Sequence, residues 1–202
     1  MGIETKKPKI NTNLKAPSNL ISKKECDKKR VLLVDTERFD INHYYHSFEL
    51  LKKCPNYTVD RDGKIYEHVP SIYSASYYKK DLDMLNKTSI IIALNNCGGL
   101  VFDNNNNKYK NWINEYVEEE EVFEFKWRRF TYWETYKTKQ LLSLSKLISY
   151  LCEIHPIPYN SPYMDGICYE DGFDVNGIIT ESNLYKTSCQ VNPSFDWKFV
   201  FD

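Results

Sequence analysis

The sequence predicts an α/β protein built on a single mixed β-sheet flanked by helices. Two continuous apolar runs, residues 30–37 and 88–96, are typical of strands buried on both faces. Residues 56–70, NYTVDRDGKIYEHVP, have the alternation and the Asp-Gly pair of a β-hairpin. Residues 131–154 have the spacing of an amphipathic helix. Short connections between these elements favour one α/β domain.

The first 28 residues differ in composition from the rest. Residues 1–28 are rich in Lys, Asn and Ser and show no apolar periodicity, so we expect an extended N-terminal arm. Such a segment buries little apolar surface by itself, and we expect a packed assembly to hold it in place. Residues 29–202 form the predicted domain, which carries an insertion at about 103–130.

The domain begins with the apolar strand 30–37, which we expect near the centre of the sheet. A helix is predicted to follow from Asp40, whose side chain suits the N-cap position. Its apolar residues have helical spacing: Ile41, Tyr44, Tyr45, Phe48 and Leu51. The hairpin turns at Asp62-Gly63, and its inward residues are Tyr57, Val59, Ile65 and Val69.

The predicted insertion combines opposite charges with aromatic residues. Asn104–Asn107 indicate an exposed turn, Glu118–Glu121 form an acidic block, and VFEFKWRRF follows at 122–130. One interpretation is a solvated, charge-paired insertion. The other is a partner-binding surface, because aromatic residues and Arg are enriched at interfaces. Its candidate residues are Trp127, Arg128, Arg129 and Phe130.

The second half contains the clearest predicted helix, residues 131–154. Its apolar face consists of Leu141, Leu144, Leu147, Ile148 and Leu151. Pro156 and Pro158 are expected to end it. A short strand is predicted at 177–180, GIIT, within a loop-rich tail.

Charge and apolar content exclude several classes of partner. The chain has 27 basic and 28 acidic residues and a net charge of −1, so no nucleic-acid partner is predicted. The apolar runs are shorter than the roughly 20 residues needed to span a bilayer, and the N-terminus lacks the apolar core of a secretion signal. The six cysteines are scattered and predict reduced thiols.

Several stretches line up, in order, with one enzyme family. VLLVDTE, the hairpin NYTVDRDGKIYEHVP, NKTSIIIAL, the helix FTYWETYKTKQLLSLSKLISYL and the closing GIITESNLYKTSCQVNPSF together resemble the zinc-dependent N-acetylmuramoyl-L-alanine amidases of the peptidoglycan-recognition and phage-lysozyme type. The resemblance covers roughly residues 30–200. It implies the fold of that family, and a zinc ion held by three protein ligands with one position open for water.

The residues that the resemblance implies for catalysis are not retained. The first His position falls on Val34, which cannot bind zinc. The second falls on Glu181, or on Ile178 or Ile179 if the register slips, and the third on Ser188, Cys189 or Asn192. A Tyr and a further His of the family fall on Pro55 and Ser74. We therefore expect a pseudoenzyme with no catalytic residues and no cofactor.

A rearranged zinc site is the alternative, with Asp35, Glu181 and Cys189 as ligands. Successive strand side chains point to opposite faces, so Asp35 should face away from the Val34 side unless a bulge intervenes.

Three functions follow from this pattern. The first is a structural or interaction component of a bacteriophage virion, with other virion or assembly proteins as partners. The abundance of Asn, Lys, Tyr and Ile, which AT-rich coding produces, points to an AT-rich bacterium or its phages. The second is a peptidoglycan-binding module without hydrolysis, and the third is an active amidase with the rearranged zinc site. The expected location is the virion for a phage protein, and otherwise the cytoplasm.

Overall fold

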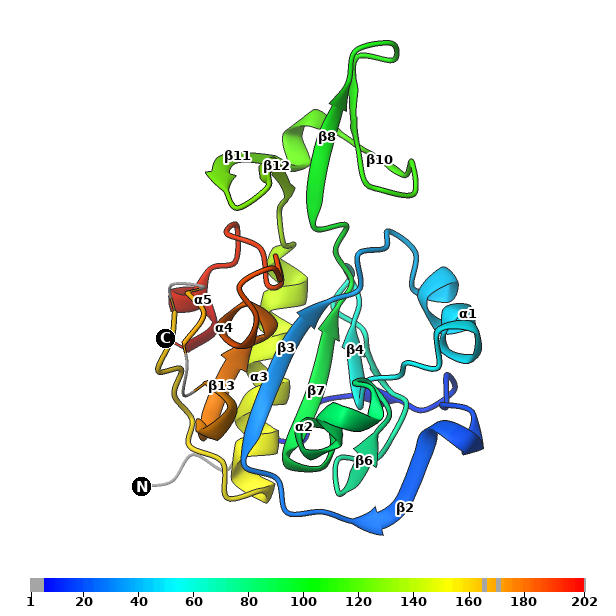
Figure 1. Cartoon of the computed structure of the whole chain (residues 1–202), viewed down its shortest axis with the longest axis vertical. Coiled ribbons are helices and arrows are strands. Elements are labelled where there is room, and N and C mark those ends of the chain that lie inside the picture. The colour runs from blue at the N-terminus through cyan, green and yellow to red at the C-terminus, as the bar shows by residue number, and fades with distance from the viewer. Residues whose placement is uncertain (1–5, 165–166, 170–171, 202) are drawn as a thin grey trace.

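The computed structural model describes residues 6–164, 167–169 and 172–201 (Figure 1). Its main sheet has six strands in the order β1-β5-β4-β7-β3-β13. These strands are β1 Ile10–Asn11, β3 Arg30–Asp35, β4 Tyr57–Val59, β5 Ile65–Glu67, β7 Ser89–Leu94 and β13 Gly177–Thr180. Strand β3 is parallel to both β7 and β13, whereas β4 and β5 are antiparallel to each other. The predicted mixed sheet is thus confirmed.

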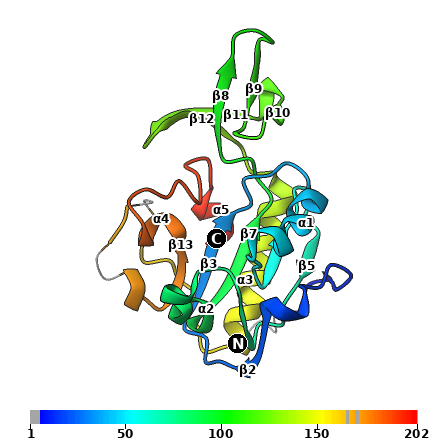
Figure 2. The same ribbon diagram turned by 45° about the vertical axis from the view of Figure 1, so that its right-hand side comes forward.

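Helices cover both faces of this sheet (Figure 2). Helix α3, Thr138–Ile154, packs Leu144 and Leu147 on the face that carries Leu33. Helices α1, Ile41–Leu51, and α2, Asp83–Thr88, pack on the other face. Helices on both faces cover β3 and β7, so every residue of these two strands is buried.

Helix α1 begins where the sequence predicts. The Asp40 side chain accepts a hydrogen bond from Asn42 N at 2.7 Å, which is the expected N-cap. Ile41 and Phe48 are buried, but Leu51 at the last turn is exposed. The apolar face therefore ends one turn earlier than its sequence spacing indicates.

The hairpin is confirmed in register and in its turn. Val59 pairs with Ile65, and both are buried together with Tyr57 and Val69. Gly63 has a φ of 84°, a conformation that glycine adopts without steric cost.

The N-terminal segment packs on its own chain, so its described part needs no assembly to hold it in place. Strand β1 runs parallel to β5, and β2, Ile21–Glu25, pairs with β6, Tyr73–Ala75. Between them lies the short 3₁₀ helix η1, Ser18–Leu20, and Ala16 N donates to His68 O at 3.1 Å. Backbone pairing supplies the contacts that the few apolar side chains could not. Residues 1–5 of the predicted arm lie outside the described residues.

The insertion is a second sheet that projects beyond the core (Figure 1). Its strand order is β10-β9-β8-β12-β11. The strands are β8 Gly99–Asp103, β9 Lys108–Lys110, β10 Tyr116–Val117, β11 Val122–Trp127 and β12 Phe130–Glu134, and the 3₁₀ helix η3, Glu119–Glu121, precedes β11. It thus extends from 99 to 134, beyond the predicted 103–130.

Strand β12 also corrects the predicted start of the helix at 131. Residues 130–134 are a strand because Tyr132 and Trp133 pair with Leu100 and Gly99 of β8. The Trp133 side chain packs within the insertion, where it is fully buried. Helix α3 begins at Thr138, and its five predicted apolar positions are all buried.

The remaining elements are short. They are η2 Lys80–Leu82, η4 Gly172–Asp174, α4 Glu181–Leu184 and α5 Trp197–Phe201. His155 caps the C-terminus of α3, just before Pro156. Within the described ranges, no helix has both the length and the apolar character to cross a membrane.

Candidate functional site

Two adjoining cavities open where β3 ends, the edge at which parallel sheets commonly bind ligands. Both are lined by Asp35, Glu37, Trp112 and Gln190. The larger, of about 360 Å³, lies toward the insertion and is also lined by Cys97, Gly98, Gly99, Arg129, Phe130 and Cys189. The smaller, of about 130 Å³, is also lined by Thr36, Arg38, Tyr44, Leu51, Lys53 and Tyr77.

Val34 and Asp35 point to opposite sides of the sheet, as strand alternation predicts. Val34 is 0% exposed and belongs to the core cluster beneath α1 and α2. Its pairing with Ala93 lies within an uninterrupted parallel register, so no bulge brings Asp35 to the Val34 side. The position at which the resemblance expects the first zinc ligand is therefore occupied by a core side chain.

Asp35 is buried and bonded from the opposite face. Tyr136 Oη donates to its Oδ1 at 2.6 Å, and Asn192 N donates to the same Tyr136 oxygen at 3.2 Å. The other carboxyl oxygen, Oδ2, is buried without a hydrogen-bond partner. Burial raises the pKa of Asp35 well above its ordinary value, and the negative charge of Glu37 raises it further.

Glu181 and Ser188, the second and third positions of the resemblance, are brought together. Thr180 precedes the short helix α4 and donates both its N and its Oγ1 to Asn183 Oδ1, which fixes where Glu181 stands. Glu181 Oε1 accepts from Tyr78 Oη at 2.9 Å, and Oε2 accepts from Ser188 Oγ at 2.8 Å. Both oxygens of this carboxylate are thus engaged by neutral hydroxyls.

Fixed cations line the smaller cavity. Lys53 Nζ lies 3.8 Å from the centre of the Tyr77 ring, and Arg38 stacks on Trp112 at 4.4 Å. Burial lowers the pKa of Lys53, while the charges of Glu181 and Glu37 raise it.

The remaining positions that the resemblance implies have surroundings different from those of Glu181 and Ser188. Pro55 and Ser74 are buried, and the Ser74 hydroxyl donates to Ala75 O at 3.4 Å. Cys189 shares the larger cavity with Asp35, and burial raises the pKa of its thiol although Arg129 and Arg128 lower it.

These residues do not fit a zinc ion. A catalytic zinc site needs three protein ligands around one point. Across the described ranges, no group of three or more His, Cys, Asp or Glu side chains is placed to hold a metal. In particular, Glu181 is bonded to Tyr78 and Ser188 and does not line the cavity that Asp35 and Cys189 share.

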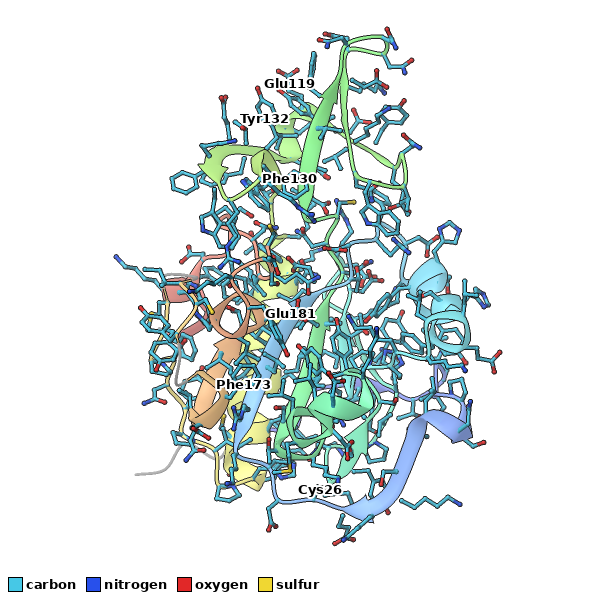
Figure 3. All side chains as sticks on the ribbon, viewed as in Figure 1. Cys26, Glu119, Phe130, Tyr132, Phe173 and Glu181 are labelled. Atoms are coloured by element: carbon cyan, nitrogen blue, oxygen red, sulfur yellow. The ribbon has the colours of Figure 1, made fainter. Side chains whose placement is uncertain are left out.

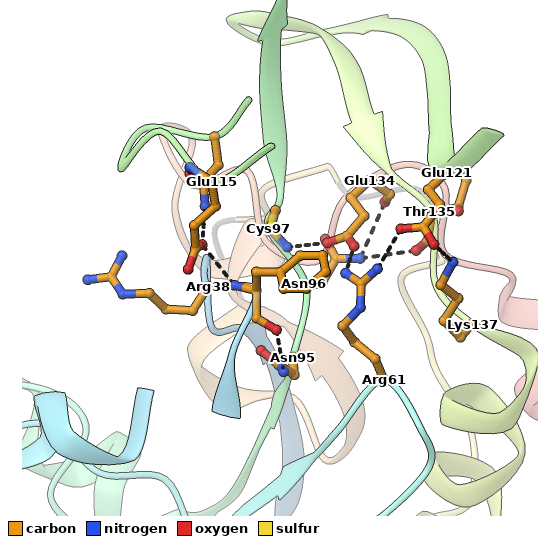
Figure 4. A network of polar contacts seen from close by, with 12 residues as sticks. Arg38, Arg61, Asn95, Asn96, Cys97, Glu115, Glu121, Glu134, Thr135 and Lys137 are labelled. Atoms are coloured by element: carbon orange, nitrogen blue, oxygen red, sulfur yellow. Dashed lines mark hydrogen bonds and ion pairs between the residues drawn. The ribbon is translucent and has the colours of Figure 1, made fainter. Parts of the chain in front are cut away.

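A buried ion network ties the insertion to the core, and sequence reasoning missed it (Figure 4). Arg61, from the hairpin turn, pairs with Glu134, which is 0% exposed, and with Glu121 at 2.6 Å. Lys137 also pairs with Glu121, and Cys97 N donates to the Glu134 carboxylate. Glu121 of the acidic block is therefore a structural ion-pair partner. The composition of the block alone did not indicate this role.

The predicted partner-binding residues form the tight turn between β11 and β12. The Arg128 guanidinium donates to the carbonyls of Tyr185 at 2.9 Å and Ser182 at 3.2 Å, and thereby ties the turn to the loop after α4. Phe130 packs directly over Gly99 and carries the Arg129 guanidinium 5.0 Å above its ring.

Phe130 therefore faces inward, toward the larger cavity. Figure 3 shows Phe130 and Tyr132 in the insertion, above Glu181 of the core. Whether this turn binds a partner stays a prediction.

Comparisons with known proteins agree on one family. The family model described as N-acetylmuramoyl-L-alanine amidase matches residues 25–179. The structure is similar to the N-acetylmuramoyl-L-alanine amidase LysC from Clostridium intestinale URNW, with a TM-score of 0.54 and 13% identity over 96% of this chain and 95% of that one.

It is also similar to the endolysine N-acetylmuramoyl-L-alanine amidase LysCS from the same organism, with a TM-score of 0.54 and 12% identity over 97% and 95%. At these identities the likeness is one of fold. No curated protein matches the sequence.

Proposed function

The chain belongs to the N-acetylmuramoyl-L-alanine amidase family, and from this premise we propose that it acts by binding rather than by hydrolysis, as a non-catalytic member of the family. The observation that carries the proposal is the buried Val34 at the position where the resemblance places the first zinc ligand. A scaffold can persist while the chemistry of its site changes, because function depends on particular side chains.

The geometry around the cleft supports this proposal. Asp35 cannot replace the missing ligand without a shift of register along β3, and that register is paired on both sides by β7 and β13. Glu181 would have to leave Tyr78 and Ser188 to bind a metal. Arg38 and Lys53 line the smaller cavity beside Glu37, so this cavity has no excess of negative charge to attract an added divalent cation.

The test is a cell-wall digestion with metal analysis. The purified chain is incubated with peptidoglycan sacculi, with and without added zinc, and released peptides are measured by mass spectrometry. LysC from Clostridium intestinale serves as the positive control. We expect no peptide release and less than one zinc per chain by elemental analysis. Stoichiometric zinc together with peptide release would refute the proposal and favour the rearranged site of Asp35, Glu181 and Cys189.

Peptidoglycan binding is the second candidate, and the two cavities favour it. They remain open at the edge where the family's fold would present a ligand, and Trp112 is 62% exposed beside them. Sedimentation with insoluble peptidoglycan tests this candidate. A Trp112→Ala variant should lose binding, whereas Met84→Ala, an apolar position of similar exposure on α2, should retain it.

A more specific version of the first proposal is that the chain is a component of a bacteriophage particle. Its supports are the composition bias and the projecting insertion with exposed aromatic residues. We expect the chain to co-purify with such a particle at a fixed copy number, with the insertion protected from protease. A chain that stays in the soluble fraction of a phage lysate, with its insertion cleaved, would contradict this form alone.

A further inference from the structure

The insertion sheet ends in an open edge strand. In the order β10-β9-β8-β12-β11, strand β11 is terminal, and among the described strands it pairs with β12 alone. Its central residues, Phe123, Glu124, Phe125 and Lys126, are all exposed, and Phe125 is 50% exposed. An exposed edge strand presents unpaired backbone groups that can pair with another strand.

The backbone direction identifies which groups are available. Thr135 N donates to Glu121 O at 2.8 Å, so this pair is a hydrogen-bonded pair of the ladder. In antiparallel sheets such pairs alternate along the strand, so the N–H and C=O of Glu124 point to the open side, whereas the Val122 N–H is already bonded to Glu119 O of η3. Trp127 pairs with Phe130 across the two-residue turn, which directs the backbone of Lys126 to the open side as well.

We propose that β11 pairs antiparallel with β11 of a second copy of this chain, about a two-fold axis at Phe125. In this register Glu124 lies opposite Lys126 of the second copy, and Lys126 lies opposite its Glu124. The outward backbone groups of these two residues then form the hydrogen-bonded pairs. A two-fold axis uses the same surface on both copies, and this strand is self-complementary.

Charge selects this register over its neighbours. A shift by one residue on each strand places either Glu124 opposite Glu124 or Lys126 opposite Lys126. Directly opposed like charges destabilise a sheet, whereas opposite charges contribute about 0.2–1 kcal/mol per pair. The chosen register contains two opposite-charge pairs by symmetry.

The flanking residues extend the complementarity. On the sheet face opposite to Glu124 and Lys126, Phe123 lies opposite Trp127 of the second copy. Such an aromatic cross-strand pair stabilises a sheet. Beyond the strand ends, the Glu121 carboxylate is already paired with Arg61 and Lys137 of its own chain, so the complementarity is confined to β11.

The ladder is short because β11 carries a bulge between Glu124 and Trp127, and a bulge bends its strand. We therefore expect a concentration-dependent dimer. This inference does not rest on the proposed function, because an active enzyme could pair through the same strand. Dimerisation and peptide release are measured separately, so either idea can fail alone.

The test is a charge swap followed by sedimentation velocity. Glu124→Lys and Lys126→Glu each oppose like charges in the dimer, and each should raise its dissociation constant about tenfold or more. The double variant restores both pairs in the reversed sense and should recover the wild-type constant. Glu49→Lys, an exposed position on α1, is the control for net charge and should leave the constant unchanged.

A disulfide supplies a second measurement of the register. Phe125 faces Phe125 of the second copy as a non-hydrogen-bonded pair, where Cβ atoms are closest. Phe125→Cys should form a covalent dimer with oxidised glutathione, at a yield above that of the wild type with its six cysteines. Phe123→Cys, which faces Trp127, is the matched control and should show the wild-type yield.

Several results would overturn the inference. A wild-type chain that stays monomeric at every concentration reached would do so. So would single swaps that dimerise like the wild type, a folded double variant that stays monomeric, or equal disulfide yields at 123 and 125. Circular dichroism of each variant establishes that it is folded before its mass is interpreted.

Discussion

Loss of the buried charge at Glu134 should weaken the attachment of the insertion to the core. Glu134 is 0% exposed, the Arg61 side chain is 14% exposed, and the two form an ion pair. The conservative change Glu134→Gln keeps the shape of the side chain and an oxygen that can accept from Cys97 N. It removes the negative charge, so Arg61 is left with Glu121 as its acidic partner in this network.

The magnitude follows from the burial of both groups. Removing one partner of a buried ion pair typically costs about 3–5 kcal/mol, because the other charge is left uncompensated. The retained pair between Arg61 and Glu121 offsets part of this cost, so we expect a loss of about 2–3 kcal/mol in the free energy of unfolding. For a chain of this size, each kcal/mol shifts Tm by about 2–4 °C, which predicts a fall of roughly 5–10 °C.

Urea unfolding followed by tryptophan fluorescence measures this free energy, and calorimetry measures Tm. Glu121→Gln is the matched comparison, because its side chain is 21% exposed against 0% for Glu134, and we expect the less buried pair to contribute less. A cycle of Arg61→Gln, Glu134→Gln and the double variant isolates the pair. A Glu134→Gln variant within about 0.5 kcal/mol of the wild type would show that the ion pair does not hold the insertion.

Two of three further predictions concern buried residues of the core, and one concerns the hairpin turn. His68 is fully buried between Thr58 Oγ1 and Leu14 O, and burial lowers its pKa to about 4, so it is neutral in the folded state. Unfolding exposes its imidazole to protonation, so the free energy of unfolding should fall as pH drops from about 6.5 to about 4, by an amount on the order of 3 kcal/mol. Urea titrations at several pH values measure this fall, and it should be absent in His68→Gln. Gly63→Ala should cost at least about 1 kcal/mol in the same titration, because φ is 84° and the new Cβ would lie 2.7 Å from Lys139 O; an unchanged midpoint would contradict this. Asn56→Ala should cost about 2–3 kcal/mol, because its buried amide serves Ile91 N at 3.0 Å and Val69 O at 3.3 Å, and a cost below about 0.5 kcal/mol would mean that water replaces it.

Local patterns predicted the core of the fold well. The apolar runs around Val34 and Ile91 became the paired strands β3 and β7, because residues buried on both faces leave no other placement. Asp40 and Gly63 marked the helix start and the turn, since both act on their own backbone.

Elements whose structure depends on partners distant in the sequence were predicted less accurately. Tyr132 and Trp133 fall within the predicted helix 131–154, yet they pair with β8, which lies more than thirty residues earlier in the chain. The N-terminal segment looked unable to fold alone, and it is in fact held by strands that follow it.

By itself, the sequence determined the family's scaffold and the absence of a metal ligand at Val34, because strand periodicity and side-chain chemistry are local properties. Only the tertiary structure decided what stands there instead. It buries Val34 in the core, turns Asp35 toward Tyr136, and joins Glu181 to Ser188. These outcomes depend on which side chains meet across the sheet. That choice is made by packing and by the need to satisfy buried polar groups, and neither can be read from spacing along the chain.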